Sequence, residues 1–205
     1  GSGVVVPDDT RAEAARLYRV LREDIMLHGL EHDAAICAQH TLGLLGIPIS
    51  PHVVARGIDD VMRGTLPGSL PVAGAIDTVR ALHSAGIPLA VVSSAAHHPF
   101  LEWSLAKFGI LDAFEFIGSS ATIGYYKSNC RIYERVLERL GSAPDEVVHV
   151  GDSHRYDVEP ARKVGMQTVW LDHGSNMGDH AADLRVTTLE GLAPLLLDRS
   201  PWCGA

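Results

Sequence analysis

The stretch VVHVGDSHRYDVEPARKVGM, residues 147–166, decides the fold of this chain. Its first four residues are mostly apolar, a Gly-Asp-Ser turn follows, and a helical pattern comes after the turn. Such a succession indicates a buried parallel strand that opens into a loop at its carboxyl end, where open α/β sheets place their ligand sites. Two carboxylates lie there, Asp152 and Asp157, and both are hard oxygen ligands of the kind that Mg²⁺ selects. In an ordinary β-α turn, Asp157 would only cap the helix.

The composition limits the classes of protein to consider. The chain has 205 residues, 46% of them hydrophobic, which suits one domain with an insertion. A net charge of −8 without a Lys/Arg-rich stripe disfavours nucleic-acid and anionic-membrane partners. No apolar run approaches the ~20 residues of a membrane span, and no signal peptide is recognised. The three cysteines are far apart and odd in number, so we expect no disulfide framework and a cytoplasmic location.

The pattern of apolar residues divides the chain near residue 68. Residues 10–63 have helical periodicity throughout, and Thr10 with Glu13 predicts a capping box at the start of the first helix. After the break Gly-Thr-Leu-Pro-Gly, strand-like runs alternate with helical segments, which predicts a parallel sheet built from β-α-β units. These runs are residues 88–92, 114–117, 147–150 and 168–171. We therefore expect a helical domain over residues 10–68 and an α/β core formed by residues 1–9 and 69–205.

Three loops of the α/β half carry polar groups in the right places for a single site. An apolar strand opens into Ser93-Ser94, Lys127 directly precedes a helix, and Asp152 lies in the Gly-Asp-Ser turn. A hydroxyl, an ammonium and a pair of carboxylates are what metal-assisted phosphoryl transfer requires. The cations offset charge on the transferred group and the hydroxyl orients an oxygen. His149, inside a predicted strand, is interpreted as a packed core histidine.

These motifs resemble those of the haloacid dehalogenase-like (HAD) hydrolase superfamily over residues 71–195. The family's second motif, a Ser or Thr at the end of an apolar strand, is similar to Ser93, and its third, a Lys before a helix, is similar to Lys127. The fourth, Gly-Asp-Ser with a second Asp, resembles Gly151 to Asp157. The resemblance implies a three-layer, Rossmann-like α/β fold with a parallel sheet and an inserted helical cap. It also implies catalytic roles for Ser93 and Lys127, Mg²⁺ at Asp152 and Asp157, and substrate contacts from Ser94 and Ser153.

The family's first motif is a strand that ends in Asp-x-Asp-Gly-Thr or Asp-x-x-Gly-Thr, and no such motif is found in this chain. Two alignments stay open. In the favoured one, Gly3-Val4 stand at the Gly-Thr, so the strand and its nucleophilic Asp precede residue 1. In the other, residues 4–6 are the strand, Pro7 replaces the nucleophile and Asp9 matches the second Asp. Under either alignment the nucleophile is missing from the expected place. Under the favoured alignment the sheet also lacks a central strand.

The resemblance also favours one chemistry. Phosphatases of the family keep Gly-Asp in the fourth motif to bind Mg²⁺, whereas its 2-haloacid dehalogenases have Ser-Asn there and need no metal. Gly151-Asp152 therefore favours a phosphomonoesterase that acts on a small phosphorylated metabolite, inactive in the present chain because the nucleophile is missing. The alternatives are a non-catalytic HAD-like domain with a role in binding or regulation and, less favoured, a 2-haloacid dehalogenase.

Overall fold

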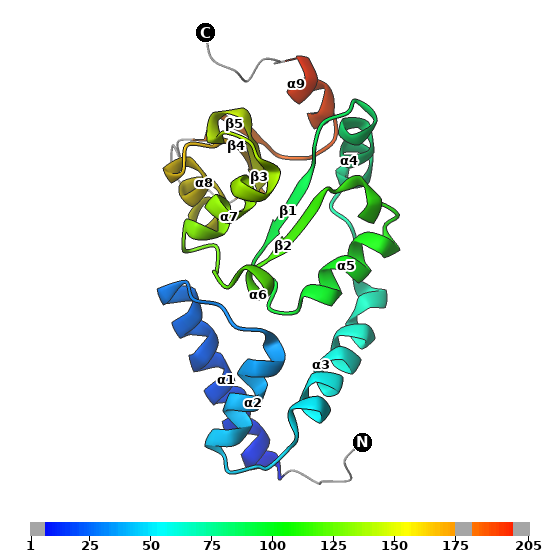
Figure 1. The fold of residues 1–205 in the computed structure, drawn as a ribbon. Coiled ribbons are helices and arrows are strands. Elements are labelled where there is room, and N and C mark those ends of the chain that lie inside the picture. The colour runs from blue at the N-terminus through cyan, green and yellow to red at the C-terminus, as the bar shows by residue number, and fades with distance from the viewer. Residues whose placement is uncertain (1–6, 175–181, 199–205) are drawn as a thin grey trace.

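The computed structural model describes residues 7–174 and 182–198. Its first three helices, α1 (Asp8–His28), α2 (Ala34–Leu44) and α3 (Pro51–Thr65), form a group at one end of the molecule, below the strands in Figure 1. The capping box predicted at Thr10 is wrong, because α1 begins two residues earlier, at Asp8. The acidic side chains of Asp8 and Asp9 lie in its first turn, where they complement the positive end of the helix dipole.

In the described residues, five short strands follow these helices. β1 (Ala90–Ser93) pairs in parallel with β2 (Phe116–Ser119). A second parallel sheet has the order β3 (Val148–Gly151), β4 (Gln167–Leu171) and β5 (Leu184–Val186). The first four strands begin and end within two residues of the predicted positions, whereas the short β5 has no apolar run that would have predicted it. The expected α/β fold with parallel sheets is confirmed.

Six further helices precede, connect or follow the strands in the described residues. They are α4 (Ala75–Ser84), α5 (His98–Lys107), α6 (Ser120–Ile123), α7 (Arg131–Leu140), α8 (Glu159–Lys163) and α9 (Leu192–Asp198), with 3-10 turns at Leu66–Gly68, Leu111–Ala113 and Pro144–Glu146 and a π-helical turn at His154–Val158. Within the two described ranges, no helix combines the length and the apolar character that crossing a bilayer would require.

The strands form two separate sheets, one that contains β1 and one that contains β3. Over the described part of the chain, β1 is paired only with β2, and β3 only with β4. Both sheets nevertheless pack against α7: Val92 of β1 and Val147, next to β3, contact the same buried cluster, which contains Ile132 and Tyr133. The facing edges of β1 and β3 thus keep backbone groups without a strand partner, as expected of a parallel sheet that lacks a central strand.

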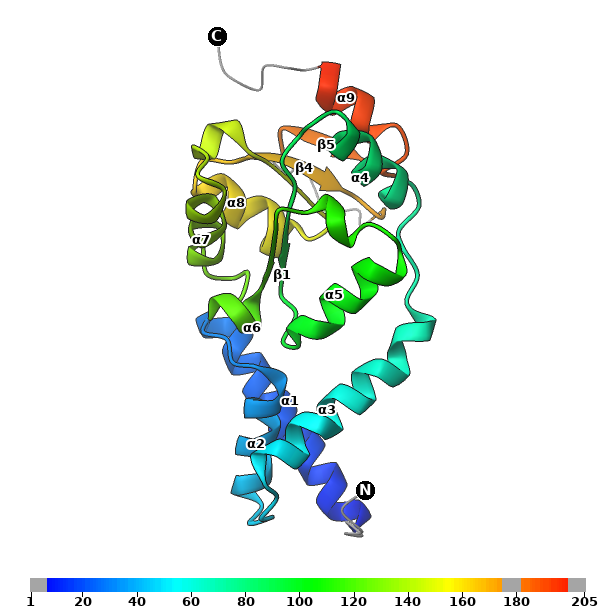
Figure 2. The same ribbon diagram turned by 45° about the vertical axis from the view of Figure 1, so that its right-hand side comes forward.

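Helix α1 points its C-terminal end toward the strands. Tyr126 donates its backbone N–H to the carbonyl of Gly29 at 3.1 Å, and Glu31 donates its own to the carbonyl of Gly124 at 3.0 Å. A helix of 21 residues is about 30 Å long, and the N-terminal end of α1 lies far from these contacts (Figures 1 and 2). Asp9 is in the first turn of α1, at that far end. The alignment that places Asp9 in the site is therefore wrong. Gly3-Val4 of the favoured alignment lie outside the described residues.

A buried ion pair fixes the α1–α2 connection to the core. The Glu31 carboxylate, whose side chain is fully buried, pairs with the Arg22 guanidinium of α1 and accepts the hydroxyl of Ser120 at 2.9 Å. On the opposite side, Nε2 of His97 lies 2.7 Å from Oδ1 of Asp59 and links α5 to α3. Side chains from the α1–α2 connection and from α3 thus both attach the N-terminal helices to the α/β core.

Candidate active site

Asp157 is the centre of a buried polar cluster at the carboxyl end of β3. The residue is only 3% exposed. Its Oδ1 forms an ion pair with Nζ of Lys127 and lies 3.1 Å from Nε2 of His149, while Oδ2 accepts the backbone N–H of Ser153 at 3.0 Å. Lys127, from the loop before α7, is therefore brought to the same end of β3 as the Gly-Asp-Ser turn, as the order of the motifs predicted.

The local sequence explains how Asp157 reaches this position. Ser153 caps the π-helical turn: its Oγ accepts the backbone N–H of Tyr156 at 3.2 Å, and its carbonyl accepts that of Asp157 at 2.7 Å. Asp157 is thus not the helix cap, because Ser153 has that role. Gly151 is needed for space, since a Cβ there would lie 2.4 Å from both Cβ and Cγ of Asp157. The glycine of the Gly-Asp-Ser turn leaves room for the second aspartate.

We expect Gly151→Ala to lower the free energy of unfolding by about 1–3 kcal/mol, the usual cost of overpacking a filled site. Urea unfolding measures the change. Gly57→Ala in α3 is the matched control, because apart from its chain neighbours and the nearby backbone of the helix itself no atom lies within 4 Å of the Cβ that it would add. There the higher helix propensity of alanine should raise stability by up to about 1 kcal/mol. Equal effects at the two glycines would contradict the packing of Asp157 on Gly151.

The charges in the cluster follow from its burial and its partners. Burial alone would raise the pKa of the Asp157 carboxyl group, but the hydrogen bond from His149 and the positive charge of Lys127 outweigh it and hold this pKa below its usual range. Burial lowers the pKa of His149, so its imidazole is neutral at pH 7. The cluster therefore holds one anion, Asp157, one cation, Lys127, and a neutral imidazole.

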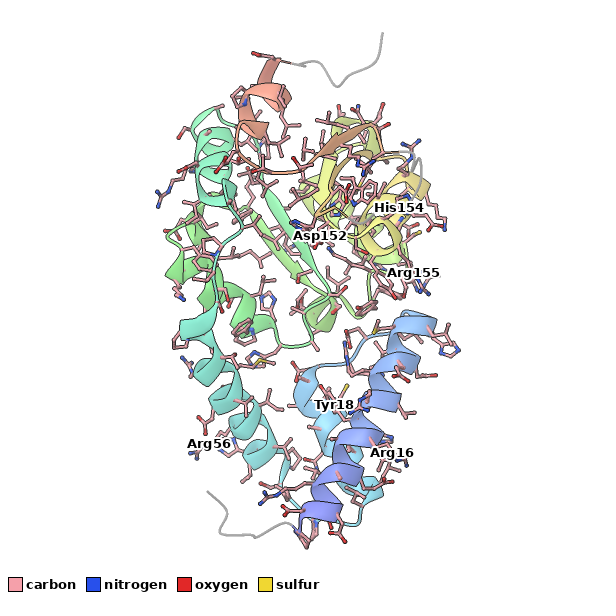
Figure 3. The ribbon with its side chains drawn as sticks, turned by 180° about the vertical axis from the view of Figure 1, so that it is seen from behind. Arg16, Tyr18, Arg56, Asp152, His154 and Arg155 are labelled. Atoms are coloured by element: carbon pink, nitrogen blue, oxygen red, sulfur yellow. The ribbon has the colours of Figure 1, made fainter. Side chains whose placement is uncertain are left out.

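Asp152 has a different environment from Asp157. Its side chain is 65% exposed, and its Oδ2 lies 4.0 Å from Nε2 of His173. Its carbonyl accepts the indole N–H of Trp170 at 3.0 Å, which holds the loop against β4. Figure 3 shows Asp152 between the green strands and the yellow π-helical turn, well away from Arg16 of α1. An open carboxylate of this kind can bind a divalent cation together with water molecules.

The second predicted metal ligand, Asp157, already uses both of its oxygens for hydrogen bonds. Its direct ligation of Mg²⁺ stays a prediction. In the part of the chain that the structure describes, no group of three or more His, Cys, Asp or Glu side chains is placed to hold a metal ion. Of the two predicted metal ligands, only Asp152 therefore offers an exposed carboxylate to the expected cation. The cation would need further oxygen ligands from other groups.

The serine motif lies on the other sheet. Ser93 is the last residue of β1 and is in register with Ser119 of β2, and Ser94 follows it directly. Ser153 adjoins Asp152 at the end of β3. The predicted site residues thus come from both sides of the gap between β1 and β3, with Ser93 and Ser94 on one side and the Asp157 cluster on the other.

Sequence reasoning missed the part of His149 in this cluster. The sequence predicted a packed core histidine, and the His149 side chain is mostly buried. Its hydrogen bond to Asp157 was not predicted, because it depends on the turn that follows the strand. A signal was present in the sequence. His149 and Gly151 are two residues apart on one strand, so they share a face of the sheet, and that is the face on which Asp157 packs.

Known proteins with similar sequences indicate the family of this chain. The sequence pattern of the haloacid dehalogenase-like hydrolases matches residues 32–165. Haloacid dehalogenase-like hydrolase domain-containing protein 3 of Mus musculus is 30% identical over 187 residues, which are 87% of this chain and 73% of that protein. A glyceraldehyde 3-phosphate phosphatase of Methanopyrus kandleri is 29% identical over 167 residues, which are 81% of this chain and 70% of the phosphatase.

Solved structures agree on the fold. A HAD phosphatase from Thermococcus onnurineus superposes with a TM-score of 0.64, at 24% identity, over 91% of this chain and 87% of that one. A 2-haloacid dehalogenase from Pseudomonas syringae pv. Tomato DC3000 gives a TM-score of 0.69, at 19% identity, over 95% of this chain and 82% of that one. At these identities the likeness concerns the fold alone. The family pattern covers well over half of the chain, which therefore belongs to the haloacid dehalogenase-like hydrolases.

Proposed function

We propose that this protein is a Mg²⁺-dependent phosphomonoesterase that acts on a small phosphorylated metabolite in the cytoplasm. The observation that carries the proposal is Lys127, held by the buried Asp157 carboxylate at the end of β3 where Asp152 is exposed. A fixed ammonium next to an open carboxylate suits the binding of a phosphoryl group together with a divalent cation. The names of several relatives, among them glyceraldehyde 3-phosphate phosphatases, point the same way.

Each predicted site residue has a role in this proposal. Lys127 offsets negative charge on the phosphoryl group, and the Ser93 hydroxyl donates a hydrogen bond to one of its oxygens. Ser94 and Ser153, which adjoin Ser93 and Asp152, provide further polar contacts to the substrate. Asp152 holds the Mg²⁺ ion, which supplies Lewis-acid polarisation of the phosphoryl oxygens when it is bound. The helices α1–α3, attached through Glu31 and His97, act as the cap that selects the substrate.

The nucleophile in this proposal is a carboxylate on an extended segment that precedes Gly1 and lies between β1 and β3. Two observations support it. The facing edges of β1 and β3 lack strand partners in the described residues. Both predicted halves of the site flank that gap.

We expect residues 1–205 by themselves to bind Mg²⁺ weakly, with no saturable heat at micromolar concentrations. Asp152 offers one open carboxylate, and the oxygens of Asp157 are occupied, so the cation lacks a second anionic ligand. Isothermal titration calorimetry measures the affinity, and Asp152→Asn removes whatever weak binding remains. Tight binding that survives Asp152→Asn would contradict this assignment of the metal site.

A panel assay of a longer polypeptide that includes the preceding segment separates the proposal from its two alternatives. Phosphate release from small phosphomonoesters that depends on added Mg²⁺ is the expected result. Halide release from 2-haloacids without metal would favour a dehalogenase, a class to which some structures of the same fold belong. Phosphate binding without release of either product would favour a non-catalytic domain, the alternative that the missing nucleophile supports.

A further inference from the structure

His149 is the one member of the buried cluster to which the proposed chemistry gives no role. It lies on β3, and its Nε2 is 3.1 Å from Oδ1 of Asp157, the same oxygen that pairs with Lys127. The ring is fixed from the other side by Tyr133, whose ring meets it edge to face at 5.0 Å and 84°. Tyr133 is fully buried and donates its hydroxyl to the carbonyl of Tyr156 at 2.6 Å. The imidazole is thus clamped in one orientation.

The hydrogen bond has only one chemically consistent direction. A carboxylate oxygen can accept but not donate, so Nε2 of His149 must carry the proton. Two donors, Lys127 and His149, then converge on Oδ1, while the backbone N–H of Ser153 holds Oδ2. The backbone N–H of Ser153 holds Oδ2 and the neutral imidazole of His149 holds Oδ1, so the Asp157 carboxylate cannot rotate. Because the imidazole is uncharged, the negative charge of the carboxylate is balanced by the ammonium of Lys127.

We propose that His149 is a positioning residue for the Lys127 ammonium. It fixes the Asp157 carboxylate, and the carboxylate in turn fixes Nζ of Lys127 at the end of β3 beside Asp152. His149 itself contacts neither the phosphoryl group nor the metal. The catalytic consequence rests on the proposed phosphatase function, but the effect on Lys127 does not and can be measured in residues 1–205.

The first test uses the reactivity of the lysines. The chain has only three, Lys107, Lys127 and Lys163, so trace acetylation read by mass spectrometry reports each separately. We expect His149→Phe, which keeps an aromatic ring against Tyr133 but removes the donor, to raise the labelling rate of Lys127 about three- to tenfold. The loss of one hydrogen bond of ordinary strength corresponds to a change of this size. His149→Gln, which can place an amide N–H near the position of Nε2, should keep the rate near that of the wild type.

Two controls separate this effect from loss of the fold. Lys107 donates to the carbonyls of Leu66, Pro67 and Ser69, so an unchanged labelling rate at Lys107 shows that the variant is folded. Tyr133→Phe removes the bond to Tyr156 but keeps the ring against His149, and should leave Lys127 unchanged. A folded His149→Phe variant with wild-type labelling of Lys127 would overturn the proposal.

A measurement on the wild-type chain keeps the proposal testable if His149→Phe unfolds. Long-range ¹H–¹⁵N NMR correlation of the His149 ring should show the proton on Nε2, and the Nδ1–H tautomer would overturn the proposal. In a longer, active polypeptide, His149→Phe should lower kcat about tenfold with little change in KM, and His149→Gln should restore most of it. If the longer polypeptide has no activity, the phosphatase function fails, while the labelling and the tautomer still decide the role of His149.

Discussion

Residues 1–205 are expected to hydrolyse aryl phosphates no faster than the background reaction, even with saturating Mg²⁺. Lys127 and Ser93 should still bind phosphate, but in the described residues no strand lies between β1 and β3 to carry a carboxylate that could receive the phosphoryl group. Removal of a covalent nucleophile from other hydrolases costs on the order of 10⁶-fold in kcat. A longer polypeptide that includes the strand-forming segment should regain this factor, and steady-state assays on both polypeptides measure it.

Two variants of the longer polypeptide, Asp152→Asn and Asp9→Asn, serve as controls. In the longer one, Asp152→Asn should abolish the regained activity, because the metal loses its anchoring carboxylate. Asp9→Asn should change nothing, since Asp9 lies in the first turn of α1, about 30 Å from the contacts between that helix and the core. Mg²⁺-dependent hydrolysis by residues 1–205 that stops on Asp9→Asn would contradict both the location of the site and the need for another strand.

The second large effect concerns stability. Asp157→Ala is expected to lower the free energy of unfolding of residues 1–205 by about 3–5 kcal/mol, the usual cost of removing one partner of a buried ion pair. It leaves Lys127, whose side chain is 14% exposed, without its counter-charge, and removes the acceptor for His149 and for the backbone of Ser153. Urea denaturation followed by circular dichroism measures the change.

An exposed ion pair of the same chemistry provides the comparison. Lys163 and Glu159 pair at 2.8 Å on α8 with side chains 61% and 48% exposed. Glu159→Ala should cost no more than about 0.5 kcal/mol, since water already solvates both charges. A change at Asp157 as small as that at Glu159 would show that the cluster does not stabilise the folded chain.

Much of the fold could be predicted because its signals are local. Each of the first four strands is a short apolar run followed by a turn, and these runs are visible without any knowledge of their partners. The division of the sheet could also be anticipated, because the absence of a first-motif strand leaves β1 and β3 without a neighbour. β5 could not, because it has three residues, one of them the charged Arg185, and pairs only through its place beside β4.

The site was less accessible from the sequence, for a physical reason. Ser93, Lys127 and Asp152 stand at ends of elements, where local patterns identify them. The choice between Asp152 and Asp157 as the open carboxylate depends on the π-helical turn, which carries Asp157 back onto Gly151. The position of Asp9 depends on the direction in which α1 runs, and periodicity does not contain that information.

The most direct test of this account is the location of the phosphoryl group during turnover. The longer polypeptide is mixed with an aryl phosphate and Mg²⁺, quenched in acid within the first turnovers and mapped by peptide mass spectrometry. We predict a single phosphoryl group on an aspartate of the segment that precedes Gly1, at the end of a strand between β1 and β3. A phosphoryl group on any residue of the present chain, such as Ser93 or Asp9, would contradict the account.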